Sequence, residues 1–239
     1  MKTTPIILIT LLSIAVILTA CTNKSHTTTH IVGLWDITDK SIPRPDAKEI
    51  TKFYGFEKDK WNGGSFRFSA ITQVSLNPSE YQDVRGANQL LSNEFKREEE
   101  IKLFEKGVAD IIDRAEQAKT GQNNSSIYLP IASELNQLAK SEADSRKILL
   151  IYSDLMENTE QFSFYRKKDL SLLVTSPESL AKQLENIQPL DELSGIEVYF
   201  IYQPSDSKSD TLFQLVSGFY KKLLEQKGAK VFISANLNN

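Results

Sequence analysis

Two apolar segments of this sequence end in carboxylates, and these carboxylates are its best candidates for chemistry. Residues 34–41 read Leu-Trp-Asp-Ile-Thr-Asp-Lys-Ser, and residues 148–154 read Ile-Leu-Leu-Ile-Tyr-Ser-Asp. Ligands of an open parallel sheet bind at the carboxyl ends of its strands, so Asp36 and Asp154 are expected at one such edge. Carboxylates placed in this way indicate a binding site more than a catalytic one.

Several usual catalytic groups are missing from the sequence. The two histidines, His26 and His30, precede the predicted globular part, so histidine-based acid–base schemes lose their usual base. We find no match to a G-x-G-x-x-G or Walker A phosphate loop. The formal net charge of −3 argues against a nucleic-acid partner.

Strands alternate with helices along the chain and predict the sheet that would position the two aspartates. Strands are expected at residues 31–37, 65–70, 72–76, 147–153, 196–202 and 229–234, and helices from about Asn93, at 127–140, from Ser176 and at 210–226. The second and third strands should form a hairpin. This order predicts an α/β fold with a doubly wound, mostly parallel sheet, helices on both faces and one antiparallel edge hairpin. The charged run at 96–100 is expected to face solvent.

The N-terminus predicts export. Residues 5–20 are uncharged and largely apolar, but they are short for a membrane span of about 20 residues. Leu-Thr-Ala-Cys at residues 18–21 resembles the bacterial lipoprotein signal, which implies a signal peptide at 1–20 and a lipid on Cys21. An uncleaved signal anchor or a plain secretory signal are the alternatives. Thr22 favours an outer-membrane anchor on the exported side of the bacterial membrane.

Residues 21–30 are expected to be the lipidated cysteine and a flexible tether, because residues 22–30 contain no apolar side chain. A coil of this length reaches on the order of 15 to 20 Å, enough to lift a domain off the headgroups. Residues 31–239 then form one domain.

Within that domain, the order of elements resembles a von Willebrand factor A domain over residues 31–236. Such domains commonly hold a divalent cation through an Asp-x-Ser-x-Ser motif, a later threonine and a further aspartate. By resemblance, Asp36 and Thr38 match the start of the motif, Ser125 or Ser126 matches the threonine, and Asp154 matches the last aspartate. The resemblance implies a site for Mg²⁺ or Mn²⁺.

Such a site would serve recognition. Magnesium takes about six oxygen ligands and readily keeps waters, so hydroxyls and carboxylates suit it. Its open position would accept a carboxylate of a partner, expected to be another protein of the cell envelope. Ser125 and Ser126 are also good helix caps, and Glu157 is either a ligand or a surface charge.

Lys40 departs from the motif, because it occupies the position of the second serine and an ammonium has no lone pair for a metal. Ser41 substitutes if the loop shifts by one residue, and Asp39 is an additional carboxylate. Alternatively, the Lys40 ammonium replaces the cation between Asp36 and Asp154, which would leave a metal-free structural scaffold of an envelope complex. A magnesium-dependent hydrolase using the aspartates is the remaining alternative to a non-enzymatic role.

Overall fold

The computed structural model describes residues 26–72, 78–117, 124–160 and 162–237. The predicted signal peptide at 1–20 and the lipidation site Cys21 lie outside these residues. Among the described helices, we find none with the length and apolar character needed to cross a bilayer.

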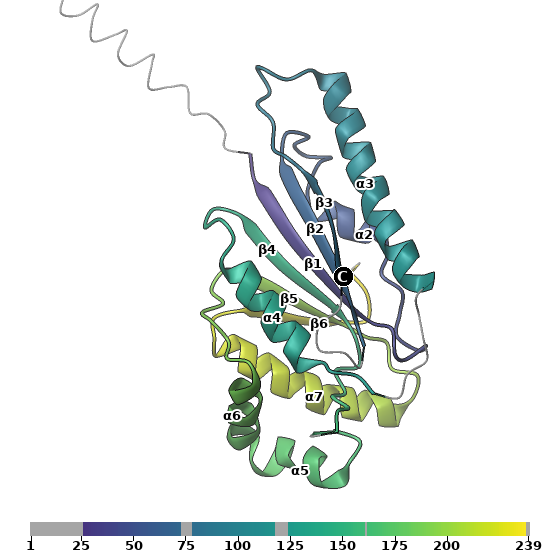
Figure 1. Ribbon diagram of the computed structural model, residues 1–239, viewed down its shortest axis with the longest axis vertical. Helices are drawn as coiled ribbons and strands as arrows, with labels where there is room; N and C mark the ends of the chain where they lie inside the picture. The colour runs from purple at the N-terminus through teal and green to yellow at the C-terminus, as the bar shows by residue number, and fades with distance from the viewer. Residues whose placement is uncertain (1–25, 73–77, 118–123, 161, 238–239) are drawn as a thin grey trace, which may run out of the picture.

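A six-stranded sheet organises the domain (Figure 1). Its strands are β1 (Thr28–Asp36), β2 (Gly63–Ile71), β3 (Ser79–Val84), β4 (Arg146–Tyr152), β5 (Ile196–Ile201) and β6 (Lys230–Ser234), in the order β3-β2-β1-β4-β5-β6. Neighbouring strands run parallel except β2 and β3, which form an antiparallel pair. The predicted sheet with one antiparallel edge hairpin is therefore confirmed.

Helices cover both faces of this sheet. They are α2 (Ala47–Lys52), α3 (Glu94–Gln117), α4 (Tyr128–Ala139), α5 (Lys167–Thr175), α6 (Pro177–Ile187) and α7 (Ser207–Glu225). Successive side chains of β4 show the two faces: Arg146 reaches the carbonyl of Phe53 after α2, whereas Lys147 donates to the carbonyls of Ala139 and Ser141 at the end of α4. Successive residues of a strand point to opposite faces, so α2 and α4 lie on opposite sides and the fold is doubly wound.

Burial explains why the central strands read as continuous apolar runs. Each residue from Ile148 to Ile151 has an exposed fraction of 0%, as does Trp35 of β1. A parallel strand covered by helices on both faces needs no polar side, so the alternating pattern disappears. Trp35, directly before Asp36, therefore belongs to the core.

The third strand lies elsewhere than predicted. Residues 79–84 form β3, whereas the predicted strand at 72–76 falls largely on residues 73–77, which lie outside the described residues. β3 is an edge strand with mainly polar side chains. Its backbone pairs with β2 from Ser79 to Val84, and this pairing needs no apolar alternation.

β1 begins at Thr28, three residues before the predicted start at Ile31. Its first residues are polar, but they pair with β2 from Gly63 onward and with β4 from Arg146 onward. Backbone hydrogen bonds to two neighbouring strands satisfy these residues without apolar side chains. Residues 28–30 therefore belong to the sheet, and the folded domain starts earlier than the predicted boundary.

The charged run at the start of α3 is only partly a solvent-facing surface. Asn93 caps the helix as predicted, since its Oδ1 accepts a hydrogen bond from the backbone N–H of Lys96 at 3.1 Å. Arg97, however, is 1% exposed. Its guanidinium donates to the backbone carbonyls of Lys60 at 2.7 Å and Arg85 at 2.8 Å, and also to the carbonyl of Asn62. A buried charge of this kind is tolerated because carbonyl oxygens solvate it.

Candidate functional site

The two aspartates lie where the strand order reverses. β1 and β4 are neighbours at the centre of the sheet. From β1 the chain continues to β2 on one side, whereas from β4 it continues to β5 on the other side. Asp36 is the last residue of β1, and Asp154 follows the end of β4 by two residues. This reversal is the usual ligand-binding crevice of open α/β sheets.

Asp36 is buried and held by three donors. Its Oδ1 accepts hydrogen bonds from the backbone N–H of Thr38 at 3.0 Å and from the Thr38 hydroxyl at 2.6 Å, and its Oδ2 accepts from the Ser153 hydroxyl at 3.1 Å. Burial raises the pKa of this carboxyl although the hydrogen bonds favour its charged form. Sequence reasoning chose Thr38 but passed over Ser153, although Ser153 directly precedes Asp154.

Asp154 lies beside the same group of charges. Its Oδ1 accepts from the backbone N–H of Met156 at 2.9 Å, and its Oδ2 lies 3.5 Å from the hydroxyl of Tyr165. Burial raises the pKa of Asp154 to about 7, and the negative charges of Asp36 and Asp39 raise it further. Tyr165 is 62% exposed, so its ring lies at the surface beside Asp154.

The serine loop lies against the segment that follows Asp154. The Ser125 hydroxyl donates to the carbonyl of Met156 at 3.3 Å, and its backbone exchanges hydrogen bonds with Asn158 at 3.1 and 2.9 Å. The N–H of Ser126 donates to the carbonyl of Thr72 at 3.1 Å. The fold thus brings both serines to the carboxyl end of the sheet, although the Ser125 hydroxyl is directed to a carbonyl rather than to a carboxylate.

Lys40 and Ser41 lie in the turn after Asp39, and both are exposed. The Asp39 Oδ1 accepts from the N–H of Ser41 at 2.7 Å. The charged groups that raise the pKa values of Asp36 and Asp154 are neighbouring carboxylates. Replacement of a metal ion by the Lys40 ammonium stays a prediction.

Glu157 caps a helix from a distance. It is 5% exposed, and its Oε2 accepts from the backbone N–H groups of Ile127 at 2.9 Å and Tyr128 at 2.8 Å. The start of α4 has no capping side chain of its own, so Glu157 satisfies two of its free N–H groups. Burial raises the pKa of Glu157 to about 7. Sequence alone left this residue open as a ligand or a surface charge, because its partners are 29 and 30 positions away.

The edge therefore gathers carboxylates and hydroxyls in a largely buried setting. In the described parts of the chain, His, Cys, Asp and Glu side chains by themselves form no group of three or more arranged to hold a metal ion. The hydroxyls of Thr38 and Ser153 contact Asp36 directly and add neutral oxygen donors.

The raised pKa values predict a pH dependence of stability in the presence of chelator. A carboxyl whose pKa is raised to about 7 by folding binds its proton more tightly in the native state, so its stabilisation is complete below pH about 4 and lost as the pH rises through 7. We expect the melting temperature of the chain to fall between pH 5 and pH 8. The Asp154→Asn and Glu157→Gln variants should each show a smaller fall in calorimetry. A melting temperature that rises through pH 7 equally in all three proteins would contradict these assignments.

Fold and site together define a doubly wound α/β domain with an acidic, hydroxyl-lined strand edge at the reversal of strand order. No protein-family model and no curated protein sequence matches the chain.

Among solved structures, the chain aligns with the pilus adhesin SpaC from Lactobacillus rhamnosus GG in its open conformation, at 10% identity and a TM-score of 0.37, over 86% of this chain and 30% of the adhesin. A further structure of SpaC aligns at 8% identity and a TM-score of 0.42, over 90% and 29% of the two chains. The conserved hypothetical protein BatB from Bacteroides thetaiotaomicron aligns at 8% identity and a TM-score of 0.38, over 88% and 91%. The chain thus spans less than a third of the adhesin.

Proposed function

We propose that this chain is a lipid-anchored recognition module of the bacterial cell envelope, similar to a von Willebrand factor A domain, which binds another protein at the edge formed by Asp36 and Asp154. The observation that carries the proposal is the gathering of buried and half-buried carboxyl groups and hydroxyls at the reversal of strand order. Loops around such an edge are accessible to a partner while the sheet holds the side chains in place.

The donor chemistry suits a divalent cation. Burial is the main reason why the pKa of Asp154 is raised, and the nearby carboxylates of Asp36 and Asp39 raise it further by repulsion. A cation held among them would relieve the repulsion, and Thr38 and Ser153 would complete the oxygen ligands. When bound, Mg²⁺ or Mn²⁺ would supply a positive charge for a partner carboxylate. Lys40 contributes no ligand, because its ammonium lacks a lone pair.

The chain's own residues favour binding over hydrolysis. Thr38 and Ser153 each donate a hydrogen bond to Asp36, which orients this carboxylate and occupies lone pairs that a general base would use. The Tyr165 hydroxyl lies over Asp154 from a largely exposed ring, where it borders the surface that a partner would contact.

Thermal unfolding with added cations tests the proposal. A ligand that binds only the native state, at about one hundred times its Kd, stabilises by about 2.7 kcal/mol. For a domain of this size we expect Mg²⁺ or Mn²⁺ to raise the melting temperature of the purified chain by about 5–10 °C. Asp154→Ala should abolish this rise. Asp144→Ala is the matched control, because Asp144 is an exposed aspartate in the turn before β4 and should leave the rise unchanged.

Partner recovery from envelope membranes separates the two roles proposed for the edge. Cation-dependent recognition requires that the parent chain retains a partner in magnesium and that chelator releases this partner. The Asp154→Ala variant should not retain it. A partner that is retained equally in chelator, together with no thermal shift at millimolar cation, would contradict cation-dependent binding. The metal-free scaffold would then be the function of this edge.

A further inference from the structure

The amino end of the domain is held in place from the first described residue. The Nδ1 of His26 lies 3.1 Å from the carboxylate of Asp59. Thr27 donates from its N–H to the Asn62 side chain at 3.1 Å and accepts at its carbonyl from the N–H of Gly63 at 3.1 Å. These contacts precede β1, so the folded part of the chain extends to His26.

This early start shortens the reach of the predicted anchor. Five peptide units separate Cys21 from His26, and in any conformation they span at most about 18 Å. If Cys21 carries a lipid, which is part of the proposed function, the bilayer surface lies within that distance of His26. The domain is then held close to the membrane rather than lifted from it.

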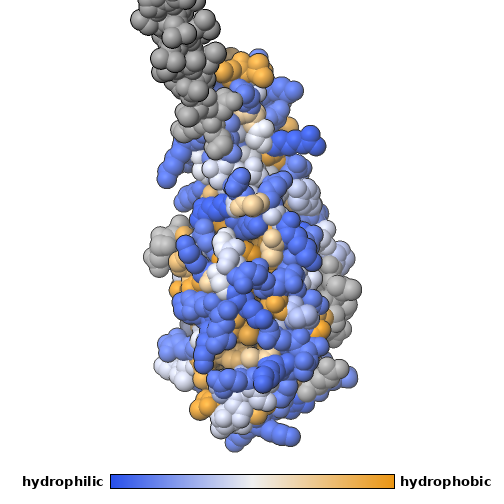
Figure 2. All heavy atoms as spheres, turned by 90° about the vertical axis from the view of Figure 1, so that its left-hand side faces the viewer, coloured by the Kyte–Doolittle hydropathy of each residue, from blue (hydrophilic) through white to orange (hydrophobic). Residues whose placement is uncertain are grey.

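An exposed apolar cluster occurs at the same end of the molecule. Leu90, Leu91 and Phe95 are 88%, 87% and 84% exposed, the highest values among the large hydrophobic side chains described as exposed. We call these three residues the apolar tip. Figure 2 shows hydrophobic side chains gathered at the upper end of the molecule. Single exposed apolar residues are ordinary, but three within six positions call for a partner.

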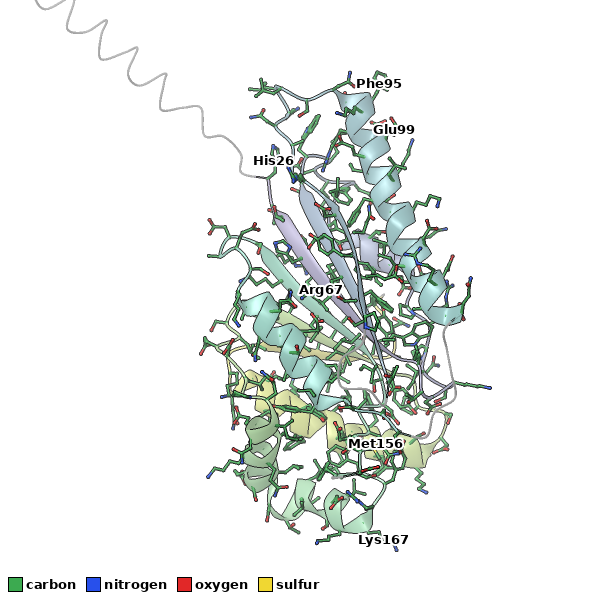
Figure 3. The ribbon with its side chains drawn as sticks, in the orientation of Figure 1. His26, Arg67, Phe95, Glu99, Met156 and Lys167 are labelled. Atoms are coloured by element: carbon green, nitrogen blue, oxygen red, sulfur yellow. The ribbon has the colours of Figure 1, made fainter. Side chains whose placement is uncertain are left out.

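Contacts join the apolar tip firmly to the amino end. Arg97 lies two residues after Phe95 in α3, and its guanidinium donates to the carbonyls of Lys60 and Asn62. The Asn62 side chain also accepts the hydrogen bond from Thr27. Figure 3 accordingly places Phe95 and His26 toward one end of the molecule and Met156, beside the acidic edge, toward the other.

The charges around the apolar tip are largely paired. Lys60 contacts Glu94 at 2.5 Å and Glu98 at 2.8 Å, and Lys96 lies 4.0 Å from Glu100. The carboxylates of residues 94–100 outnumber the neighbouring cations, so this surface has no electrostatic attraction to anionic lipid. Apolar contact with the bilayer interface is therefore the interaction that these side chains suit.

We propose that Leu90, Leu91 and Phe95 insert into the headgroup region of the bilayer that holds the lipid of Cys21. Lipid and apolar tip together give two attachments at one end, which restricts how the domain tilts. Because β1 runs from Thr28 to Asp36, the acidic edge projects roughly 25 Å away from the membrane, toward a partner. The second attachment orients the binding site.

Site-directed fluorescence on the full chain in membrane vesicles tests this inference. We would introduce Leu91→Cys or Val174→Cys, attach an environment-sensitive dye, and add lipids that carry a quencher at headgroup depth. Val174 is the matched control, because it is apolar and 69% exposed and belongs to α5, which lies at the opposite end of the molecule from the start of β1 (Figure 1). Quenching at Leu91 should lower the emission by about twofold, since interfacial side chains sink about 5–10 Å into the bilayer. Emission at Val174 should not change.

A second variant separates the apolar tip from mere proximity. In a chain labelled through Gln89→Cys, the triple substitution Leu90→Ser, Leu91→Ser and Phe95→Ser should remove the quenching while membrane attachment and melting temperature persist. Quenching that survives the triple substitution would overturn the inference. So would a blue-shifted Leu91 label that lipid quenchers do not reach, which would indicate a second copy or another protein on the apolar tip.

The parent chain without an added cysteine distinguishes the two proposals. A lipid on Cys21 blocks the only thiol, so the parent should take up no dye. Dye uptake at Cys21 would refute the anchor and with it the docking. No uptake in the parent, combined with an unquenched Leu91 label, would refute the docking alone.

Discussion

Glu157→Ala is expected to lower the free energy of unfolding by about 3–4 kcal/mol, because it leaves two buried N–H groups at the start of α4 without an acceptor. For a domain of this size the melting temperature should fall by roughly 6–16 °C. Circular dichroism of the purified variant measures the change. The effect is large because α4 has no capping side chain of its own, and because the carboxylate sits 5% exposed where water cannot replace it.

Two controls show that the cap causes the loss. Glu157→Gln keeps an oxygen acceptor of the same shape without a buried charge, so its free energy of unfolding should stay within about 1 kcal/mol of the parent. Glu160→Ala, three residues on and exposed, should stay within about 0.5 kcal/mol of the parent. If the Ala and Gln variants of Glu157 melted together near the parent, the capping role would be wrong.

Arg97→Ala should destabilise the chain by about 3–5 kcal/mol. The substitution removes the donor to three backbone carbonyls and leaves a void in a site that is 1% exposed. We expect a fall in melting temperature of roughly 6–20 °C by calorimetry. Since these carbonyls belong to the segments around the amino end, amide exchange should also rise there before it rises in β4.

Arg97→Lys separates charge from geometry. An ammonium keeps the positive charge but cannot reach three carbonyls in the fixed directions of a guanidinium, so most of the loss should remain. Lys96→Ala is the neighbouring control, because the Lys96 side chain is 76% exposed, and it should change stability by about 0.5 kcal/mol at most. A Lys variant as stable as the parent would show that charge alone matters there.

Much of the sheet was predictable because strands that are buried on both faces consist of continuous apolar residues. Residues 148–151 are apolar throughout since both faces of β4 are covered, and Asp36 and Asp154 stand at the strand ends as expected. The polar strand β3 and the polar start of β1 were misplaced. Both depend on backbone pairing with a neighbouring strand, and backbone groups are the same in every residue.

The candidate site was predictable to the same extent. Asp36 and Thr38 are close in sequence, and their hydrogen bonds follow from a local turn. Ser153 and Tyr165 were not chosen. Ser153 contacts Asp36 because β1 and β4 are neighbours in the sheet, and Tyr165 lies near Asp154 because the segment after β4 folds back.

By itself, the sequence determined the alternation of strands and helices, the absence of histidine from positions after 30, and the arrival of two aspartates at strand ends. These properties follow from local periodicity and composition. Only the tertiary structure decided that Glu157 caps α4, that Arg97 is buried, and that the apolar tip lies at the amino end. Each of these depends on residues distant in the chain, whose proximity follows from strand order and crossover rather than from any local pattern.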